Sequence, residues 1–324
     1  MGLKAALPSE LLAWLDRAAL LPAAVPFWLL VAGHSLTAVE LFRGYTRSWL
    51  VSWLVCYLAA FGGGLLTALL MMDPREASIA LFSKDAIGIS FTLTWWAYFY
   101  LPAGLGPTVA SLAPVRSGAK VARAILRANQ IVQRVNASVK LFPGLVGAPL
   151  VLGTLAGSGG KLLTDAFSRC AGYPSAGPSE LHQPSYVLRS AALLAALQYS
   201  LVHALGLLSV QQGLGLATSL LVAHSLATDL TGNPCDFTAP LGRLFHKITL
   251  IPEVGAAAAA APGAAAAATP AAKAARTPRA SRQRAAPAVV SSPEHTADDS
   301  ATPKVAPASA RRRARRRTAA VEQE

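Results

Sequence analysis

Five basic residues share one face of a segment in the middle of the chain. At 100° per residue they fall within a stripe about 60° wide, which consists of Arg116, Lys120, Arg123, Arg127 and Arg134. No Asp or Glu occurs between Pro114 and Lys140, so the partners of this stripe must come from elsewhere: carboxylates of other helices, water in a cavity, or lipid phosphates. The planar guanidinium group matches phosphate oxygens bidentately, and basic pockets between helices suit phosphoinositide head groups.

We therefore expect an anionic-lipid site on this helix, with Arg116, Lys120, Arg123 and Arg127 as its candidate residues. Three alternatives remain open: a voltage-sensing helix, an amphipathic helix lying in the plane of the membrane interface, and a plain solvated face.

A lysine and an aspartate stand one turn apart in the apolar segment from Leu141 to Arg169. The segment is long enough to cross a bilayer, which takes about 20 residues as a helix, and a lysine at membrane depth costs roughly 2.5–3.5 kcal/mol. Lys161 and Asp165 have the i, i+4 spacing at which the two charges neutralise each other. In the functional interpretation, Lys161 instead lines a water-filled path in which its charge regulates the passage of cations.

Two glycine runs interrupt apolar segments in corresponding halves of the chain. One is Gly62, Gly63 and Gly64, and the other is Gly157, Ser158, Gly159 and Gly160. Glycine weakens a helix and lets backbones or ligands approach closely, and paired glycine-interrupted spans indicate a transport site at a repeat interface. We expect both runs to kink their helices and to line a pore together with Lys161 and Asp165. The alternative is that the glycines are only contact points between packed helices.

Other kinds of chemistry lack their motifs. Gly160-Lys161 is followed by Leu162 instead of Ser or Thr, so the chain has no P-loop. The three cysteines are scattered and form neither a zinc site nor a disulfide framework, and no catalytic triad or carboxylate pair is assembled by spacing. We expect no enzyme activity, no cofactor, no metal site and no nucleic-acid partner; the lone histidines, such as His34, are expected to be hydrogen-bonded packing residues.

The elements that position these residues are predicted to be transmembrane helices. The sequence is 53% hydrophobic and 14% charged, whereas soluble domains carry about 25% charged residues. Apolar runs separated by Pro- and Gly-rich breakers predict seven spans, at about 20–38, 49–72, 86–101, 108–139, 141–169, 187–208 and 214–230. The fold class is thus an all-α polytopic membrane protein, with a membrane domain over residues 1–250.

Two sets of three spans followed by one additional helix suggest inverted repeats, because units with an odd number of spans enter the membrane from opposite faces. The glycine runs then fall in the second helix of each repeat, which are helices 2 and 5. Ten basic loop residues on the C-terminal side against six on the other, with six arginines more at 311–317, place the C-terminus in the cytosol.

Residues 251–324 form a segment rich in Ala and Pro that contains no Leu, Ile, Phe or Trp beyond Pro252, so we expect a disordered basic cytosolic tail. Its run RRRARRR is expected to touch anionic lipid, or to act as a localisation-like patch, or to remain solvated without a partner.

Short stretches of the chain resemble the trimeric intracellular cation (TRIC) channel family. The matching pieces are Ala38-Val39-Glu40-Leu41, Ser48-Trp49-Leu50, the glycine-containing second helix, Pro114-Val115-Arg116, Arg123 and Arg127 before Ile131, Gly157-Ser158-Gly159, and Gln198. The resemblance implies a homotrimer of the endoplasmic or sarcoplasmic reticulum with a hydrated pore in each subunit. It also implies permeation by monovalent cations, mainly potassium, that balances charge when calcium leaves the store.

The resemblance further implies that phosphatidylinositol bisphosphate binds at Arg123 and Arg127. In one departure, animal members carry a lysine just before Gly-Ser-Gly, where this chain has Ala156, and the lysine here follows at position 161. Besides the channel, two functions stay open: an inverted-repeat secondary transporter for a small solute, and a membrane scaffold that acts through its basic tail.

Overall fold

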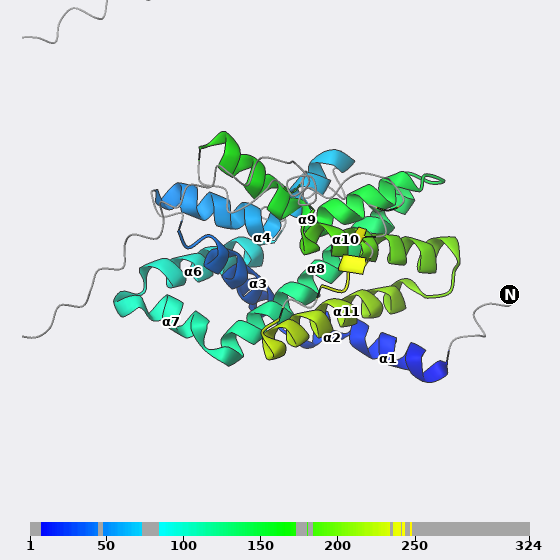
Figure 1. Ribbon diagram of the computed structural model, residues 1–324, viewed down its shortest axis with the longest axis horizontal. Coiled ribbons are helices and arrows are strands. Elements are labelled where there is room, and N and C mark those ends of the chain that lie inside the picture. Colours follow the sequence, from blue (N-terminus) through cyan, green and yellow to red (C-terminus); the bar gives the residue numbers. More distant parts are fainter. Residues whose placement is uncertain are drawn as a thin grey trace, which may run out of the picture. The chain divides into compact units, whose positions relative to one another are not determined.

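The computed structural model describes residues 8–44, 48–72, 84–172, 180, 184–233, 236–240, 242–243 and 247. The predicted tail, residues 251–324, lies outside these ranges and stays a prediction. Within the described residues every regular element is a helix (Figure 1): α1 Ser9–Ala19, α2 Leu21–Ala24, α3 Phe27–Leu41, α4 Trp49–Met71, α6 Asp85–Tyr100, η2 Pro102–Gly104, α7 Leu105–Ser111, α8 Ala113–Leu141, α9 Gly147–Cys170, α10 Tyr186–Gln198, the π-helical η3 Tyr199–Ala204 and α11 Val210–Thr231.

Local sequence signals set several helix ends. The Ser185 hydroxyl accepts the backbone N–H of Val187 at the start of α10, and Ser209 and Gln212 form a capping box at the start of α11. Gly232 ends α11 with φ at +67°, a conformation that glycine adopts without strain. Two predicted segments are divided. Residues 20–38 were expected as one helix, but Val25 is extended, with ψ of 135°, and separates α2 from α3. Residues 108–139 were also expected as one helix, but the chain turns at Leu112, whose ψ of 131° separates α7 from α8.

Helix α8 lies at the centre of the packing. It contacts α3, α9, α10 and α11, and Figure 1 shows it running between them. On one side, buried Ile125 and Leu126 join a cluster with aromatic residues such as Phe61 and Phe91. On the other side, Ile131 and Val135 pack with residues of α10 and α11. The central helix is thus also the one that carries the basic stripe.

Three described helices are long and apolar enough to cross a membrane: α4, α10 with η3 (Tyr186–Ala204), and α11. A fourth candidate is the pair Ser9–Ala24 and Phe27–Leu41, which is bent by 87°. Helices α3 and α6 have 15 and 16 residues, so each is about 22–24 Å long and shorter than the apolar layer of a typical bilayer. The interpretation as seven spans therefore stays a prediction.

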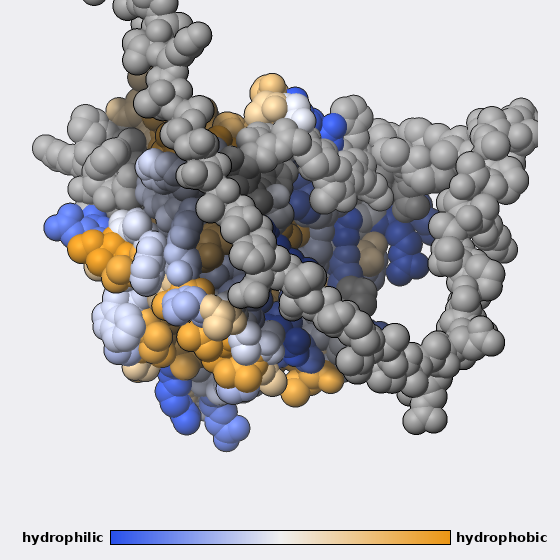
Figure 2. Space-filling view, turned by 90° about the vertical axis from the view of Figure 1, so that its left-hand side faces the viewer, coloured by the Kyte–Doolittle hydropathy of each residue, from blue (hydrophilic) through white to orange (hydrophobic). Residues whose placement is uncertain are grey.

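Helix α6 presents an apolar stripe to the outside. Ile89, Leu93, Trp96 and Tyr100 recur at helical spacing and are half or more exposed. Figure 2 shows hydrophobic side chains gathered over part of this face of the molecule. Exposed apolar surface of this kind is typical of a membrane or protein contact.

The predicted breaks at the two glycine runs are wrong. Both runs lie inside uninterrupted helices, α4 and α9, which pack against each other. A Cβ atom added at Gly159 would lie 2.8 Å from the Cα of Gly63, and one at Gly62 would lie 3.0 Å from the Cα of Gly160. The absence of side chains thus allows direct backbone contact between the two helices, and this packing outweighs the weak helix propensity of glycine.

The contact between α4 and α9 is reciprocal. A Cβ at Gly63 would collide with the carbonyl oxygen of Ala156, four residues before Gly160. A Cβ at Gly160 would lie 2.5 Å from the carbonyl oxygen of Ala59, four residues before Gly63. The hydroxyl of Thr67 donates to the Gly63 carbonyl at 2.9 Å, and that of Thr164 donates to the Gly160 carbonyl at the same distance. Each helix therefore places a glycine against a backbone carbonyl of the other helix.

Candidate functional site

The basic stripe of α8 is divided among different partners. Its first two cations face Asp229, on α11: Lys120 forms an ion pair with this carboxylate, and Arg116 Nε lies 3.3 Å from Oδ1. Ser117 donates to the same side chain, whose exposed fraction is only 8%. Sequence reasoning allowed a carboxylate of another helix but did not identify Asp229. Arg116 and Lys120 thus have a protein counter-ion in this structure.

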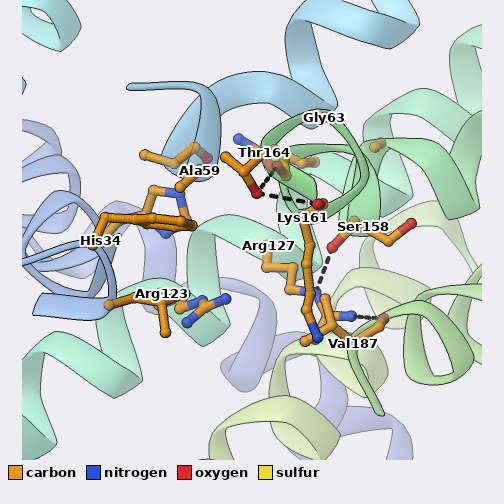
Figure 3. A pocket seen from close by; sticks show the side chains of 16 residues that line it. His34, Ala59, Gly63, Arg123, Arg127, Ser158, Lys161, Thr164 and Val187 are labelled. Atoms are coloured by element: carbon orange, nitrogen blue, oxygen red, sulfur yellow. Dashed lines mark hydrogen bonds between the residues drawn. The ribbon is translucent and has the colours of Figure 1, made fainter. Parts of the chain in front are cut away.

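Arg123 and Arg127, the next two cations, line a cavity of about 50 Å³ (Figure 3). We call it the arginine cavity; its other lining residues are His34, Leu41, Phe42, Ala59, Ala60, Gly63, Gln130, Ala156, Gly157, Ser158, Gly160, Lys161, Thr164 and Val187. Residues of both predicted glycine runs therefore face this cavity, as does Lys161. The arrangement brings candidate residues from three predicted segments to one place.

Arg127 is buried, and acceptors on two helices hold it. Its Nε donates to the carbonyl oxygen of Gly157 at 2.8 Å, and its Nη2 donates to the carbonyl of Val187 and to the hydroxyl of Ser190 at 2.9 Å. Its exposed fraction is 8%. The side chain therefore ties α8 to α9 and to the first turn of α10.

His34 makes the corresponding contact between α3 and α4. Its Nε2 lies 2.7 Å from the carbonyl oxygen of Ala60, to which it donates. His34 is thus a hydrogen-bonded packing residue, as expected, and it also lines the arginine cavity. Its Nδ1 has no partner among the described residues.

Arg123 differs from Arg127. Its guanidinium group has no hydrogen-bond or ion-pair partner among the described residues, and Figure 3 shows it beside His34 with no dashed contact. A half-buried cation that faces a cavity without a carboxylate is suited to a mobile anion or a lipid phosphate.

A second cavity, of about 210 Å³, continues along α3 and α8. We call it the Gln133 cavity; its lining residues are Phe27, Val31, Phe61, Gly64, Lys84, Ile87, Leu126, Asn129, Gln130, Gln133, Arg134 and Ala156. The arginine cavity is lined by the end of α3 and by residues 123–130 of α8, and the Gln133 cavity by the start of α3 and by residues 126–134 of α8. Gln130 and Ala156 line both cavities. The two cavities thus follow one another and meet at these two residues.

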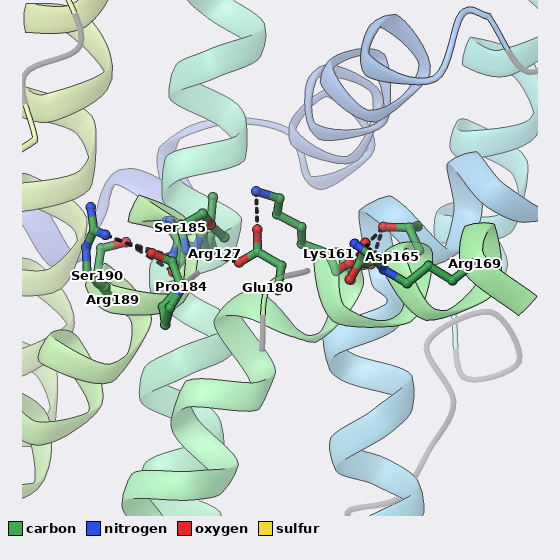
Figure 4. A network of polar contacts seen from close by, with 12 residues as sticks. Arg127, Lys161, Asp165, Arg169, Glu180, Pro184, Ser185, Arg189 and Ser190 are labelled. Carbon is green, nitrogen blue, oxygen red and sulfur yellow. Dashed lines mark hydrogen bonds and ion pairs between the residues drawn. The ribbon is translucent and has the colours of Figure 1, made fainter. Parts of the chain in front are cut away.

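Lys161 and Asp165 each have another ion-pair partner (Figure 4). Lys161 pairs with Glu180, whose side chain is only 6% exposed, and Asp165 Oδ1 accepts from Arg169 Nε at 3.1 Å. The alternative in which Lys161 and Asp165 neutralise each other did not include Glu180, which lies 19 positions from Lys161. Lys161 lines the arginine cavity, whereas Asp165 is not among the described residues of either lining.

Sequence reasoning also missed Gln130, which no motif distinguishes from other polar residues of α8.

No group of three or more His, Cys, Asp or Glu side chains in the described part of the chain is placed to hold a metal ion.

A family model described as "TRIC channel" matches residues 43–227. Among curated proteins, the chain is 28% identical over 155 residues to "Trimeric intracellular cation channel type B" of Danio rerio, covering 48% of this chain and 52% of the relative. It is 24% identical over 151 residues to "Trimeric intracellular cation channel type 1B.2" of Caenorhabditis elegans, covering 46% of each. The matches thus span about half the length of these relatives.

Among solved structures, one described as "Structural basis for activity of TRIC counter-ion channels in calcium release" has a TM-score of 0.59 and 19% identity, covering 67% of this chain and all of the other. A C. elegans trimeric intracellular cation channel with bound Ca²⁺ has a TM-score of 0.57 and 22% identity, covering 68% and 98%. At these identities the two likenesses establish the fold.

Proposed function

Because the chain belongs to the TRIC channel family, we propose that it conducts monovalent cations, chiefly potassium, along a path inside each subunit. The observation that carries this proposal is the series of two cavities along α3 and α8, which meet at Gln130 and Ala156. Polar side chains are among the lining residues of both cavities, as a hydrated ion path requires. Helices α4 and α9 are in direct backbone contact at the glycine runs. The proposed path therefore runs alongside this contact and not between the two helices.

The path is closed by positive charge in this state. Arg123, Arg127 and Lys161 face the arginine cavity, Lys84 and Arg134 face the Gln133 cavity, and no described residue lining either cavity is acidic. An excess of positive charge along the path repels a permeating cation strongly where water is scarce. Conduction therefore needs these side chains to move or to be neutralised.

An anionic lipid supplies that neutralisation in our proposal. Arg123 is the cation to which a phosphoinositide head group binds first, because Arg127 is engaged by carbonyls and Arg116 and Lys120 by Asp229. Arginine holds phosphate through paired, charge-assisted hydrogen bonds. A head group with more phosphates carries more negative charge. It would therefore compete more strongly with Asp229 for Arg116 and Lys120.

We further propose seven spans arranged as two inverted repeats, α3–α4–α6 and α8–α9–α10, with α11 added. The reciprocal contacts of Gly63 and Gly160 support this arrangement. So do His34 and Arg127, which lie on the first helix of each unit and donate to the carbonyls of Ala60 and Gly157, on the second helix of each. Repeats of this kind place a permeation site at their interface.

The names of the relatives support a homotrimer in an intracellular membrane. We propose the endoplasmic reticulum as its location, with the C-terminus and its basic tail in the cytosol. The matched structure described as a counter-ion channel in calcium release supports the role of balancing charge as calcium crosses the same membrane. Since the family consists of channels, we propose no enzyme activity.

Planar-bilayer recording of the purified full-length chain, with potassium on one side and sodium on the other, tests the proposal. We expect unitary current steps whose reversal potential follows the cation gradient, and currents that remain after residues 252–324 are deleted. Slow, saturable solute uptake without current steps would overturn the proposal in favour of a transporter. Loss of all function on deletion of the tail would favour a scaffold.

A further inference from the structure

A closed ring of contacts surrounds part of the arginine cavity, and one acidic residue completes it. Lys161 of α9 pairs with Glu180, and the other oxygen of Glu180 accepts the backbone N–H of Ser185 at 3.1 Å (Figure 4). The Ser185 hydroxyl caps α10 by accepting the N–H of Val187 at 3.2 Å. Glu180 therefore joins a side chain of α9 to the first turn of α10.

Arg127 completes the ring on the other side. Its guanidinium group binds the Val187 carbonyl and the Ser190 hydroxyl of α10, and it also binds the Gly157 carbonyl of α9. Gly157 lies one turn before Lys161, so the two anchor points of the ring share one face of α9. Lys161, Gly157, Arg127 and Val187 all line the arginine cavity.

We propose that Glu180 is a positioning residue that locks the first turn of α10 against α9 and thereby keeps Arg127 across the arginine cavity. This proposal rests on the proposed conduction path, because it assigns Glu180 the role of stabilising the closed state.

The two partners of the ion pair depend on it to different degrees. The Glu180 side chain is 6% exposed, whereas that of Lys161 is 44% exposed. Without Glu180, Lys161 can turn to water at little cost. Without Lys161, Glu180 is left as a buried charge with no counter-ion and must leave its place. Neutralising Glu180 is therefore the milder change and Lys161→Met the more severe one, although both open the lock.

Glu180→Gln in the full-length chain is the test, because glutamine keeps the shape and removes the charge. We expect the open probability in planar bilayers to rise about two- to fivefold, the range that a partly exposed ion pair supplies. Hydrogen exchange of residues 185–189 should accelerate by a similar factor. Lys161→Arg should behave as wild type, and adding Glu180→Gln to Lys161→Met should bring the effect back toward that of Glu180→Gln alone, because it removes the buried charge that Lys161→Met leaves without a counter-ion.

Glu40→Gln provides the matched control, because Glu40 adjoins Leu41 and Phe42 of the same cavity but lies outside the ring. It should leave exchange of residues 185–189 unchanged. The proposal is overturned if Glu180→Gln leaves that exchange at the wild-type rate, or if Glu40→Gln accelerates it equally. If the wild-type chain carries no current but Glu180→Gln still accelerates the exchange, the conduction path fails while the positioning role of Glu180 stands.

Discussion

Gly63 of α4 and Gly160 of α9 occupy equivalent places in one helix contact, each lying against the backbone of the other helix. A Cβ at either position would collide with a carbonyl oxygen of the partner helix, that of Ala156 or that of Ala59. Backbone carbonyls cannot rotate away as a flexible side chain can. This pair therefore fixes the distance between α4 and α9 beside the arginine cavity.

Gly63→Ala should destabilise the protein strongly, whereas Gly64→Ala should not. The added methyl group at position 63 meets two carbonyl oxygens, and such overpacking costs about 1–3 kcal/mol. At position 64 no atom lies within 4 Å of an added Cβ, and alanine favours a helix by about 0.5–1 kcal/mol over glycine. Thermal unfolding of the two purified variants in detergent measures the difference; equal midpoints would contradict it.

The positions of most helices follow from local signals in the sequence. Apolar runs of membrane length, ended by segments such as Pro102–Pro107, predict helices because those signals act within a few residues. The predicted glycine breaks were wrong because contacts between distant segments decide the structure there. The weak propensity of Gly62 and Gly63 is local, but the helix is held by contacts with residues almost 100 positions away, which one sequence does not display.

The ion pairs of the site also depend on residues that are far apart in the sequence. The spacing of Arg116 and Lys120 places them on one face, but their partner Asp229 comes from α11. Lys161 forms its ion pair with Glu180, which is distant in the sequence, and not with Asp165, which lies one turn away. A sequence shows which cations need counter-ions, while the fold selects the carboxylates that supply them.

Asp229→Asn should increase binding to anionic lipid. Asparagine keeps an acceptor for Ser117 but removes the charge that holds Lys120 and Arg116. Each basic residue released near the surface should raise the affinity about fivefold. Co-sedimentation with vesicles containing phosphatidylinositol bisphosphate provides the measurement, at low and high salt, because the gain should shrink as salt screens it.

Asp236→Asn is the control for this variant, since Asp236 pairs with Arg189 of α10 rather than with α8. It should leave lipid affinity within error of wild type. A similar gain from both variants would mean that net charge alone, and not the release of Lys120 and Arg116, sets the affinity.

Arg123→Ala and Arg127→Ala should have different main effects. Arg123 has no hydrogen-bond or ion-pair partner among the described residues. Its loss should therefore reduce phosphoinositide affinity about tenfold or more, since a hydrogen bond to a charged group contributes about 1.5–3 kcal/mol. Arg127→Ala removes the donor that three acceptors on α9 and α10 share, so it should chiefly lower the unfolding midpoint. Vesicle binding and thermal unfolding of both variants separate these effects. Equal losses of affinity with equal midpoints would contradict the assignment.

Gln130→Ala should widen the boundary between the two cavities and raise the unitary conductance. Gln130 and Ala156 are the residues that line both cavities, and alanine at position 130 removes the longer of these two side chains. Because the boundary is the narrow point of the proposed path, shortening its side chain should increase current at every voltage. Gln133→Ala, one turn further along α8, changes only the lining of the Gln133 cavity and should have a smaller effect. Single-channel recording of both variants in symmetric potassium decides the matter, and a larger gain from Gln133→Ala than from Gln130→Ala would place the narrow point elsewhere.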